Sequence, residues 1–178
     1  MYPEHVTTER LSLQRWVSVA HAPALTTLNA VPAVVRFLND SIPYTADQSR
    51  AQSERFALHW ATYGFGLWAV ELEGSVVGFA GAAHPMWLPQ YAHEVEVGWR
   101  LHPSVWGNGY ATEAGRAAID AALTHLGLAR IIACIDPANT ASIAVASRLG
   151  MTVGETVAHP QQPGSLHIYE SRCEQFGA

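Results

Sequence analysis

Lysine is absent from this sequence of 178 residues, and charged residues of both signs make up only 14% of it. All ten cationic residues are therefore arginines, and fifteen acidic residues leave a formal net charge of -5. Nucleic-acid-binding proteins usually carry a basic tract or patch, and no basic tract is present in this chain. The composition therefore argues against a nucleic-acid partner, while the 49% of hydrophobic residues predicts a folded globule rather than a disordered chain.

Cysteines and long apolar runs are also few. The two cysteines, Cys134 and Cys173, lie far apart without a CxxC pair, so the sequence predicts neither a disulfide framework nor a cysteine zinc site. No apolar stretch approaches the roughly 18 residues that a membrane-spanning helix needs, and the N-terminus lacks the pattern of a secretory signal. We therefore expect one cytoplasmic domain over residues 1–178 with no membrane contact, because this length suits a single hydrophobic core.

Hydrophobic patterns divide the chain into strands and helices. The sequence predicts strands over 11–16, 67–72, 76–81, 94–101, 131–135, 152–157 and 166–171, and longer helices over 47–63, 112–126 and 139–149. Shorter helical pieces over 19–37 are expected to break at Pro23 and Pro32, because proline removes a helical hydrogen bond. This order predicts an α/β (α+β) fold with one mixed, mostly antiparallel sheet flanked by helices.

A glycine-rich segment, 103–111, joins the end of a predicted strand to the start of a predicted helix. Gly107 and Gly109 lie where the backbone must approach a ligand closely, and the helix N-terminus adds unpaired amides and the positive end of its dipole. Such a loop can hold a diphosphate without lysine. An isolated Gly-x-Gly is more often an ordinary tight turn with a helix cap, and the segment matches neither a P-loop nor a dinucleotide-binding fingerprint.

Five ordered segments extend this pattern over nearly the whole chain: Thr8–Leu11, Gly98–Leu101, Trp106–Ala114, Pro137–Ser142 and Leu149–Met151. Together they resemble the GNAT superfamily of N-acetyltransferases. Their order and spacing are similar to its branch of ribosomal-protein N-terminal (alanine/serine) acetyltransferases. The resemblance implies a GNAT-like domain whose sheet is split near its fourth and fifth strands. It also implies acetyl-CoA as co-substrate and a primary amine as acceptor, and it suggests a homodimer.

By this resemblance, the cofactor lies along a strand end and the glycine loop. The strand ending at Trp99–Leu101 would pair its backbone with the pantetheine arm, and Asn139 would hydrogen-bond to that arm. Ser104 stands where the family has Gln or Arg. The backbone amides of the loop are still expected to bind the pyrophosphate, but a side-chain contact from position 104 is not. The implied cofactor-binding residues are Trp99, Arg100, Leu101, Trp106, Gly107, Asn108, Gly109, Tyr110, Ala111, Thr112, Asn139 and Ser142.

Acetyl transfer to an amine requires a base or water relay, a donor to the thioester carbonyl and an acid for the leaving thiolate. Glu94 and Glu96 alternate on the predicted strand 94–101, so their carboxylates share one face, where mutual repulsion and partial burial would raise one pKa. The alternative is a solvated strand face that carries two ordinary acids.

Two hydroxyl groups are candidates for the acid. Ser142 resembles the serine that this branch places near the cofactor sulfur as a candidate general acid. The alternative is a serine that satisfies backbone amides at a helix N-terminus. Tyr110 competes for the acid role, but its place in the glycine loop favours packing or a phosphate-side role.

Three histidines and one apolar loop complete the candidates. His84, His93 and His102 lie near strand ends, but their spacing is not that of a compact ligand set, so we predict no metal site. Trp87, Leu88 and Tyr91, in the loop 86–92, would form an apolar wall for the acceptor amine, and the alternative is a loop that covers the core.

The sequence thus predicts an acetyl-CoA-dependent N-acetyltransferase that works by direct attack in a ternary complex. A peptide or protein N-terminus and a small amine are the two acceptor classes, and the sequence does not choose between them. The alternative, from another functional class, is a non-catalytic acetyl-CoA-binding module that serves as a sensor or partner subunit. Variants Glu96→Gln and Ser142→Ala would separate the two, because only an enzyme loses turnover while it keeps its cofactor affinity.

Overall fold

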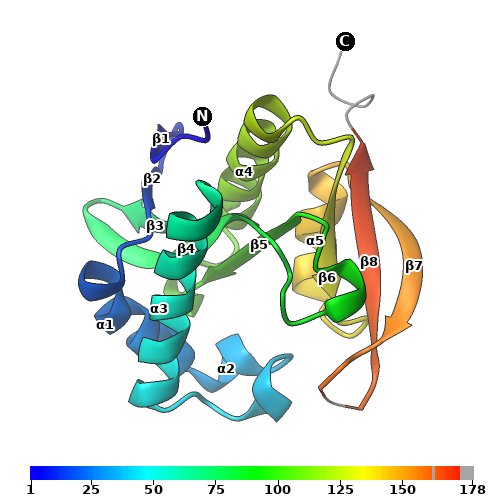
Figure 1. Cartoon of the computed structure of the whole chain (residues 1–178). Helices are drawn as coiled ribbons and strands as arrows, with labels where there is room; N and C mark the ends of the chain where they lie inside the picture. The colour runs from blue at the N-terminus through cyan, green and yellow to red at the C-terminus, as the bar shows by residue number, and fades with distance from the viewer. Residues whose placement is uncertain (162, 173–178) are drawn as a thin grey trace.

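An eight-stranded mixed sheet lies at the centre of the computed structural model, which describes residues 1–161 and 163–172 (Figure 1). In spatial order the strands are β1 (His5–Thr7), β2 (Ser12–Arg15), β3 (Leu67–Leu72), β4 (Ser75–Ala83), β5 (Glu96–Leu101), β6 (Arg130–Ile135), β8 (Ser165–Arg172) and β7 (Thr152–Ala158). Neighbouring strands run antiparallel except β5 and β6, which run parallel. The predicted mixed, mostly antiparallel sheet is therefore confirmed.

Helices connect these strands at the predicted places. They are α1 (Ser18–Asn29), α2 (Pro32–Val35), α3 (Ala46–Tyr63), α4 (Tyr110–Leu126) and α5 (Thr140–Arg148), with short 3-10 turns η1 (Asn39–Ser41), η2 (Pro89–Tyr91) and η3 (Pro103–Val105). Gly127 ends α4 with a φ of 64°, which a glycine adopts without strain. In the part of the chain that the structure describes, no helix has both the length and the apolar character needed to cross a membrane.

One predicted helix boundary is wrong. Helix α1 continues through Pro23, whereas Pro32 does separate α1 from α2 and stands at the first position of α2. Pro23 leaves the carbonyl of Val19 without its helical partner. Both residues lie on the exposed side of α1, where water can replace the missing hydrogen bond, so the helix tolerates the proline.

Helices cover both faces of the sheet. In Figure 1, α3 passes in front of the strands and α4 lies behind them. The strand β5 shows the same division, because successive side chains of a strand point to opposite faces. Its Trp99 lies against Gly115 of α4, while its Arg100 reaches Asn29 of α1. The front face of β5 therefore looks toward α1 and α3.

The sheet is split between β5 and β6. The two strands share a single register pair, Glu96 with Ile132, and the Ile132 amide donates to the Val95 carbonyl at 3.0 Å. Beyond this pair they have no ladder, so the edge of β5 from Val97 to Leu101 does not pair with β6. The short strand β1 precedes the predicted strands, so the split expected between the fourth and fifth strands lies here between the fifth and sixth.

The loop between β4 and β5 bridges this split. The main core cluster lies between the sheet and the helices, and the fully buried Trp16 and Trp68 are among its largest side chains. A second, smaller cluster lies beneath the loop and joins it to β6 and β8. Its buried members are Leu88, Tyr91, Ile132, Leu166 and Ile168.

Candidate active site

The glycine loop 106–109 leads from η3 to the N-terminus of α4. Gly107 and Gly109 have φ angles of 79° and 82°, the left-handed region that favours glycine. The first helical bond of α4 runs from the Glu113 amide to the Gly109 carbonyl at 3.0 Å. No residue that the structure describes accepts a hydrogen bond from the backbone amides of residues 107–112. This set of amides, at the positive end of a 17-residue helix, is suited to an anion.

Side chains of the loop hold it from within. The Trp106 indole Nε1 donates to the Leu101 carbonyl at 2.7 Å, although nearly half of Trp106 is exposed. The Asn108 Nδ2 donates to the carbonyls of Val105 and Trp106 at 3.2 and 3.1 Å. Both side chains therefore shape the loop, and its amides remain the groups that can meet a ligand.

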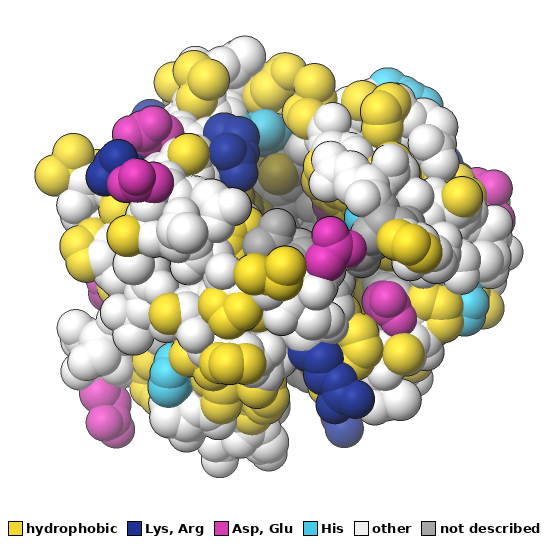
Figure 2. Space-filling model, turned by 90° about the horizontal axis from the view of Figure 1, so that it is seen from below, with side chains coloured by type: hydrophobic (Ala, Val, Ile, Leu, Met, Phe, Trp, Pro, Cys, Tyr) yellow, Lys and Arg dark blue, Asp and Glu magenta, His cyan; other side chains and the backbone are white. Residues whose placement is uncertain are grey.

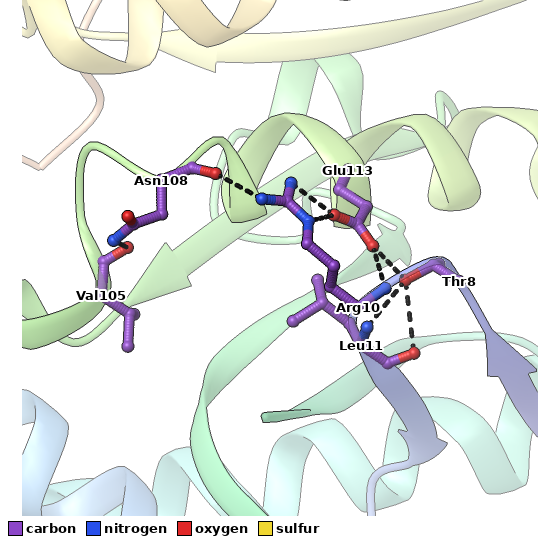
Figure 3. Close-up of polar contacts among 6 residues, drawn as sticks. All are labelled: Thr8, Arg10, Leu11, Val105, Asn108 and Glu113. Carbon is purple, nitrogen blue, oxygen red and sulfur yellow. Dashed lines mark hydrogen bonds and ion pairs between the residues drawn. The ribbon is translucent and has the colours of Figure 1, made fainter. Parts of the chain in front are cut away.

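Arg10, for which the sequence predicts no role of its own, ties the glycine loop to the β1–β2 turn (Figure 3). Its Nη1 donates to the Asn108 carbonyl at 2.9 Å, and its Nη2 lies 2.6 Å from the Glu113 carboxylate. Glu113, in the first turn of α4, also accepts from Thr8 Oγ1 at 2.6 Å. The Arg10 guanidinium lies over the Tyr110 ring at 4.6 Å. The motif Thr8–Leu11 contained this residue, but only the fold shows what it contacts.

Glu96 lies where β5 and β6 separate. Trp87 Nε1 donates to its Oε2 at 3.2 Å and the Cys134 amide donates to its Oε1 at 3.3 Å, while the Cys134 side chain also hydrogen-bonds to it. Burial raises the pKa of Glu96 to about 7, against the opposing effect of these hydrogen bonds. A carboxyl group with this pKa can take up and release a proton near neutral pH.

The sequence predicts neither a disulfide nor a zinc site at Cys134, and no local pattern in it indicates that Cys134 lies beside Glu96. It is a free thiol. Burial and the nearby Glu96 carboxylate raise the pKa of the thiol, so it stays protonated and can donate to that carboxylate. The other cysteine, Cys173, lies outside the described residues.

Glu94 does not share the environment that the sequence predicted for it. The strand β5 begins at Glu96, so Glu94 lies in the preceding bend. Its Oε1 pairs with Arg130 Nη2 at 2.6 Å, and this hydrogen bond lowers the pKa of Glu94 despite partial burial. The raised pKa of Glu96 comes from burial rather than from repulsion by Glu94, because Glu94 is compensated by Arg130.

Asn139 and Ser142 lie at the start of α5. The Asn139 Oδ1 caps the helix by accepting from the Ser142 amide at 3.1 Å. Among the described residues, none forms a hydrogen bond with the Ser142 hydroxyl. The capping role considered for Ser142 therefore belongs to Asn139, and the Ser142 hydroxyl is available to a ligand.

The two aromatic residues of the β4–β5 loop have different environments. Tyr91 is buried in the second core cluster, and its hydroxyl hydrogen-bonds to Glu155 on β7. Burial raises the pKa of Tyr91 to about 12. Trp87 is only half-buried, with its ring centroid 5.6 Å from that of His159 and its Nε1 directed at Glu96. Tyr91 therefore belongs to a loop that covers the core, as the alternative had it, whereas Trp87 reaches Glu96, the candidate general base.

Two residues of β5 that were predicted to bind the cofactor have side chains on opposite faces of the sheet. Trp99 packs against α4, and the Arg100 side chain points to the other face. A cofactor along the strand edge would therefore contact Arg100 through its backbone.

The three histidines near strand ends have separate partners. His84 Nδ1 hydrogen-bonds to the Glu94 carbonyl and His102 Nδ1 to the Ser104 hydroxyl. His93 lies beside the Glu94 carboxylate. Within residues 1–161 and 163–172, no group of three or more His, Cys, Asp or Glu is placed to hold a metal.

The surface is hollowed near its centre when it is viewed from below the orientation of Figure 1, and hydrophobic side chains lie around the opening (Figure 2). A split sheet, a strand edge that pairs with no described strand, and a glycine loop at a helix N-terminus together define a domain that can hold an extended ligand with an anionic group. The chain belongs to the acetyltransferase (GNAT) domain family, which matches residues 10–152. The predicted family and fold are therefore confirmed.

Known proteins show the same relationship. The chain is similar to the uncharacterised protein YkkB of Bacillus subtilis, 34% identical over 62% of this chain and 63% of YkkB. It is also similar to the FsC-acetyl coenzyme A-N(2)-transacetylase of Aspergillus fumigatus, 33% identical over 72% of this chain and 57% of that enzyme. Both matches span less than two thirds of the relative's length. A crystal structure of an acetyltransferase from Agrobacterium tumefaciens superposes with a TM-score of 0.80 at 29% identity, over 97% of this chain and 96% of the other.

Proposed function

We propose that this protein is an acetyl-CoA-dependent N-acetyltransferase that transfers an acetyl group to a primary amine by direct attack in a ternary complex. The observation that carries the proposal is Glu96, a half-buried residue whose carboxyl group has a pKa of about 7 and lies at the point where β5 and β6 separate. The glycine loop lies beyond the other end of the same strand. Membership of the acetyltransferase family and the name of the Aspergillus relative support this assignment.

The chain offers groups that fit each part of the cofactor. The free amides of residues 107–112 suit a pyrophosphate, which explains how a protein without lysine can bind one. The edge of β5 from Val97 to Leu101, which pairs with no described strand, offers backbone groups to the amide-containing pantetheine arm. Asn139 uses its Oδ1 as a helix cap, so its Nδ2 is the group that would donate to that arm. Acetyl-CoA, when bound, supplies the acetyl thioester.

Two side chains would move the protons. As the C–N bond forms and the C–S bond breaks, one proton leaves the amine and one proton must reach the sulfur. Glu96 accepts the amine proton, directly or through water, because its pKa lets it ionise near pH 7. The Ser142 hydroxyl, free of the helix cap, relays a proton to the sulfur. Trp87 and Cys134 hold the Glu96 carboxylate by hydrogen bonds and so position it.

A test of this function uses acetyl-CoA with a panel of peptides and small primary amines, and measures the free thiol that transfer releases. We expect turnover with at least one amine, and a lower kcat in Ser142→Ala with unchanged affinity for acetyl-CoA. Binding of acetyl-CoA without turnover on any amine would instead favour the non-catalytic binding module. Turnover confined to peptides, or to small amines, would identify the acceptor class.

Arg10 is expected to position the glycine loop for the cofactor. Its bonds to Asn108 and Glu113 join the loop to the first turn of α4, so Arg10→Gln should weaken acetyl-CoA binding by about tenfold, the effect of losing one charged hydrogen bond. Isothermal titration calorimetry measures this change. Arg15→Gln is the matched control, because Arg15 forms an ion pair of the same length with Glu4 away from the loop. Equal affinities of the two variants would contradict the positioning role.

A further inference from the structure

The side chain of Arg100 is a cation without an anionic partner in the part of the chain that the structure describes. It is half-buried, its Nη1 donates to the Asn29 Oδ1 at 2.7 Å, and its guanidinium lies over the Phe79 ring at 5.0 Å. No described carboxylate forms an ion pair with it, and no other hydrogen bond of this side chain is found among the described residues. Most of its N–H donors are therefore available.

The surroundings hold this guanidinium in one orientation. Asn29 is fully buried, and its Nδ2 donates to Ser49 Oγ at 3.2 Å and to Gln52 Oε1 at 2.8 Å. These bonds fix which way the Asn29 amide faces, so its oxygen is directed at Arg100. A neutral amide oxygen satisfies one donor but does not balance the charge. Burial lowers the pKa of Arg100 to about 10, so it remains charged at neutral pH.

Open space lies on the same face of β5 between this cation and the candidate base. Glu96, Gly98 and Arg100 alternate along the strand and therefore share one face. A Cβ atom placed on Gly98 would meet no other residue within 4 Å apart from its chain neighbours. A strand advances about 3.3 Å per residue, so the Cα atoms of Glu96 and Arg100 lie roughly 13 Å apart. A short extended molecule can reach from one to the other.

We propose that Arg100 binds a carboxylate of the acceptor, so that the substrate class is a primary amine with a carboxylate several bonds away. This inference rests on the proposed function, because it places the reacting amine at Glu96. A single guanidinium balances the single charge of a carboxylate and can bind it bidentately, whereas a phosphate dianion would keep one uncompensated charge. The net charge of -5 is compatible with an anionic substrate, because net charge affects the rate at which a substrate meets the protein rather than the chemistry of a pocket.

The test compares ω-amino acids of increasing chain length with their primary amides, which differ only in the carboxylate. We expect kcat/KM of the unaltered protein to favour the acid over the amide by about 10- to 100-fold at the best chain length, as expected for hydrogen bonds to a charged group. Arg100→Gln should bring this ratio close to one. Arg55→Gln, at an exposed arginine of α3, is the control that should keep the ratio.

A second variant tests the charge without removing the arginine. Asn29→Asp places a carboxylate against Arg100 Nη1, keeps the size of the side chain, and should abolish the preference for acids by neutralising the cation internally. It also covers the case in which Arg100→Gln does not fold. Equal kcat/KM for acid and amide in the unaltered protein, or an unchanged ratio in folded Arg100→Gln, would overturn the proposal.

Calorimetry separates this inference from the proposed function. The same acids and amides are titrated into the unaltered protein loaded with CoA, so that binding is measured without turnover. Tighter binding of the acids, lost in Asn29→Asp, with no acetylation of any amine would support the carboxylate site and reject the enzyme. Acetylation of amines without any preference for the acids, either in kcat/KM or in affinity, would support the enzyme and reject the carboxylate site.

Discussion

Replacing Glu96 by glutamine is expected to lower kcat by about 10²- to 10⁴-fold, the usual contribution of a positioned general base. Glutamine has nearly the same shape but cannot accept the amine proton. Steady-state thiol release at saturating acetyl-CoA measures the effect, and titration calorimetry shows whether cofactor binding is retained. The comparison with Glu94→Gln decides between the two predicted bases. A much smaller decrease is expected there, because the Glu94 carboxylate is held in an ion pair with Arg130.

The pH dependence of kcat gives an independent reading of the same group. Burial raises the pKa of Glu96 to about 7, so the carboxylate is protonated and inactive below this pH and becomes an active base above it. We therefore expect kcat to rise with pH through about 7 in the unaltered protein, and this rise to disappear in Glu96→Gln. A variant profile that still rises near pH 7 would assign the titration to another group, such as the amine itself.

Replacing Gly109 by tryptophan should weaken acetyl-CoA binding by on the order of 100-fold or more, since the loss of two charged hydrogen bonds already costs this much. Gly109 has a φ of 82°, and the nearest described atom to a Cβ placed there is Arg10 Nη2, at 3.5 Å. A large side chain would therefore occupy the space beside the loop amides and would also strain the backbone. Isothermal titration calorimetry measures the affinity, and circular dichroism shows whether the variant is folded.

Gly127→Trp is the matched control for this variant. Gly127 ends the same helix, has a φ of 64°, and has no described atom within 4 Å of a Cβ placed on it. Both substitutions therefore carry a similar backbone strain, but only Gly109 lies in the loop. If the two variants bind acetyl-CoA equally well, the loop is not the pyrophosphate site, and the proposed position of the cofactor is wrong.

Local sequence signals were sufficient for most of the fold. Alternating apolar residues and glycine punctuation predicted β2, the hairpin of β3 and β4, β6, and the terminal pair β7 and β8, because strand periodicity and turn chemistry act over a few residues. The error at Pro23 arose because the exposure of α1 on that side depends on how the helix packs. The start of β5 was placed two residues early for a similar reason, since the second core cluster holds the preceding loop in a bend.

The candidate site was predicted only in part. Gly107 and Gly109 could be identified from sequence, because a strand followed by a glycine loop and a helix is a local anion-binding pattern. Arg10 and Glu113 lie 103 residues apart, and Glu96 and Cys134 come from strands on either side of the split. Such contacts have no local signature, so their partners were missed. The roles of Glu96 and Ser142 in transfer stay predictions until the variants are measured.

The family, the order of strands and helices, and the glycine loop could all be predicted from the amino-acid sequence alone, because they follow from periodicity, glycine positions and ordered motifs. Folding, by contrast, places Glu96 in a desolvated site and leaves Arg100, a half-buried arginine, without a carboxylate partner among the described residues. Glu94 and Glu96 look alike in the sequence, yet Arg130 pairs with one while burial raises the pKa of the other. The pKa and the pairing of a charged group depend on the solvent and charges around it, and folding brings those together from distant parts of the chain.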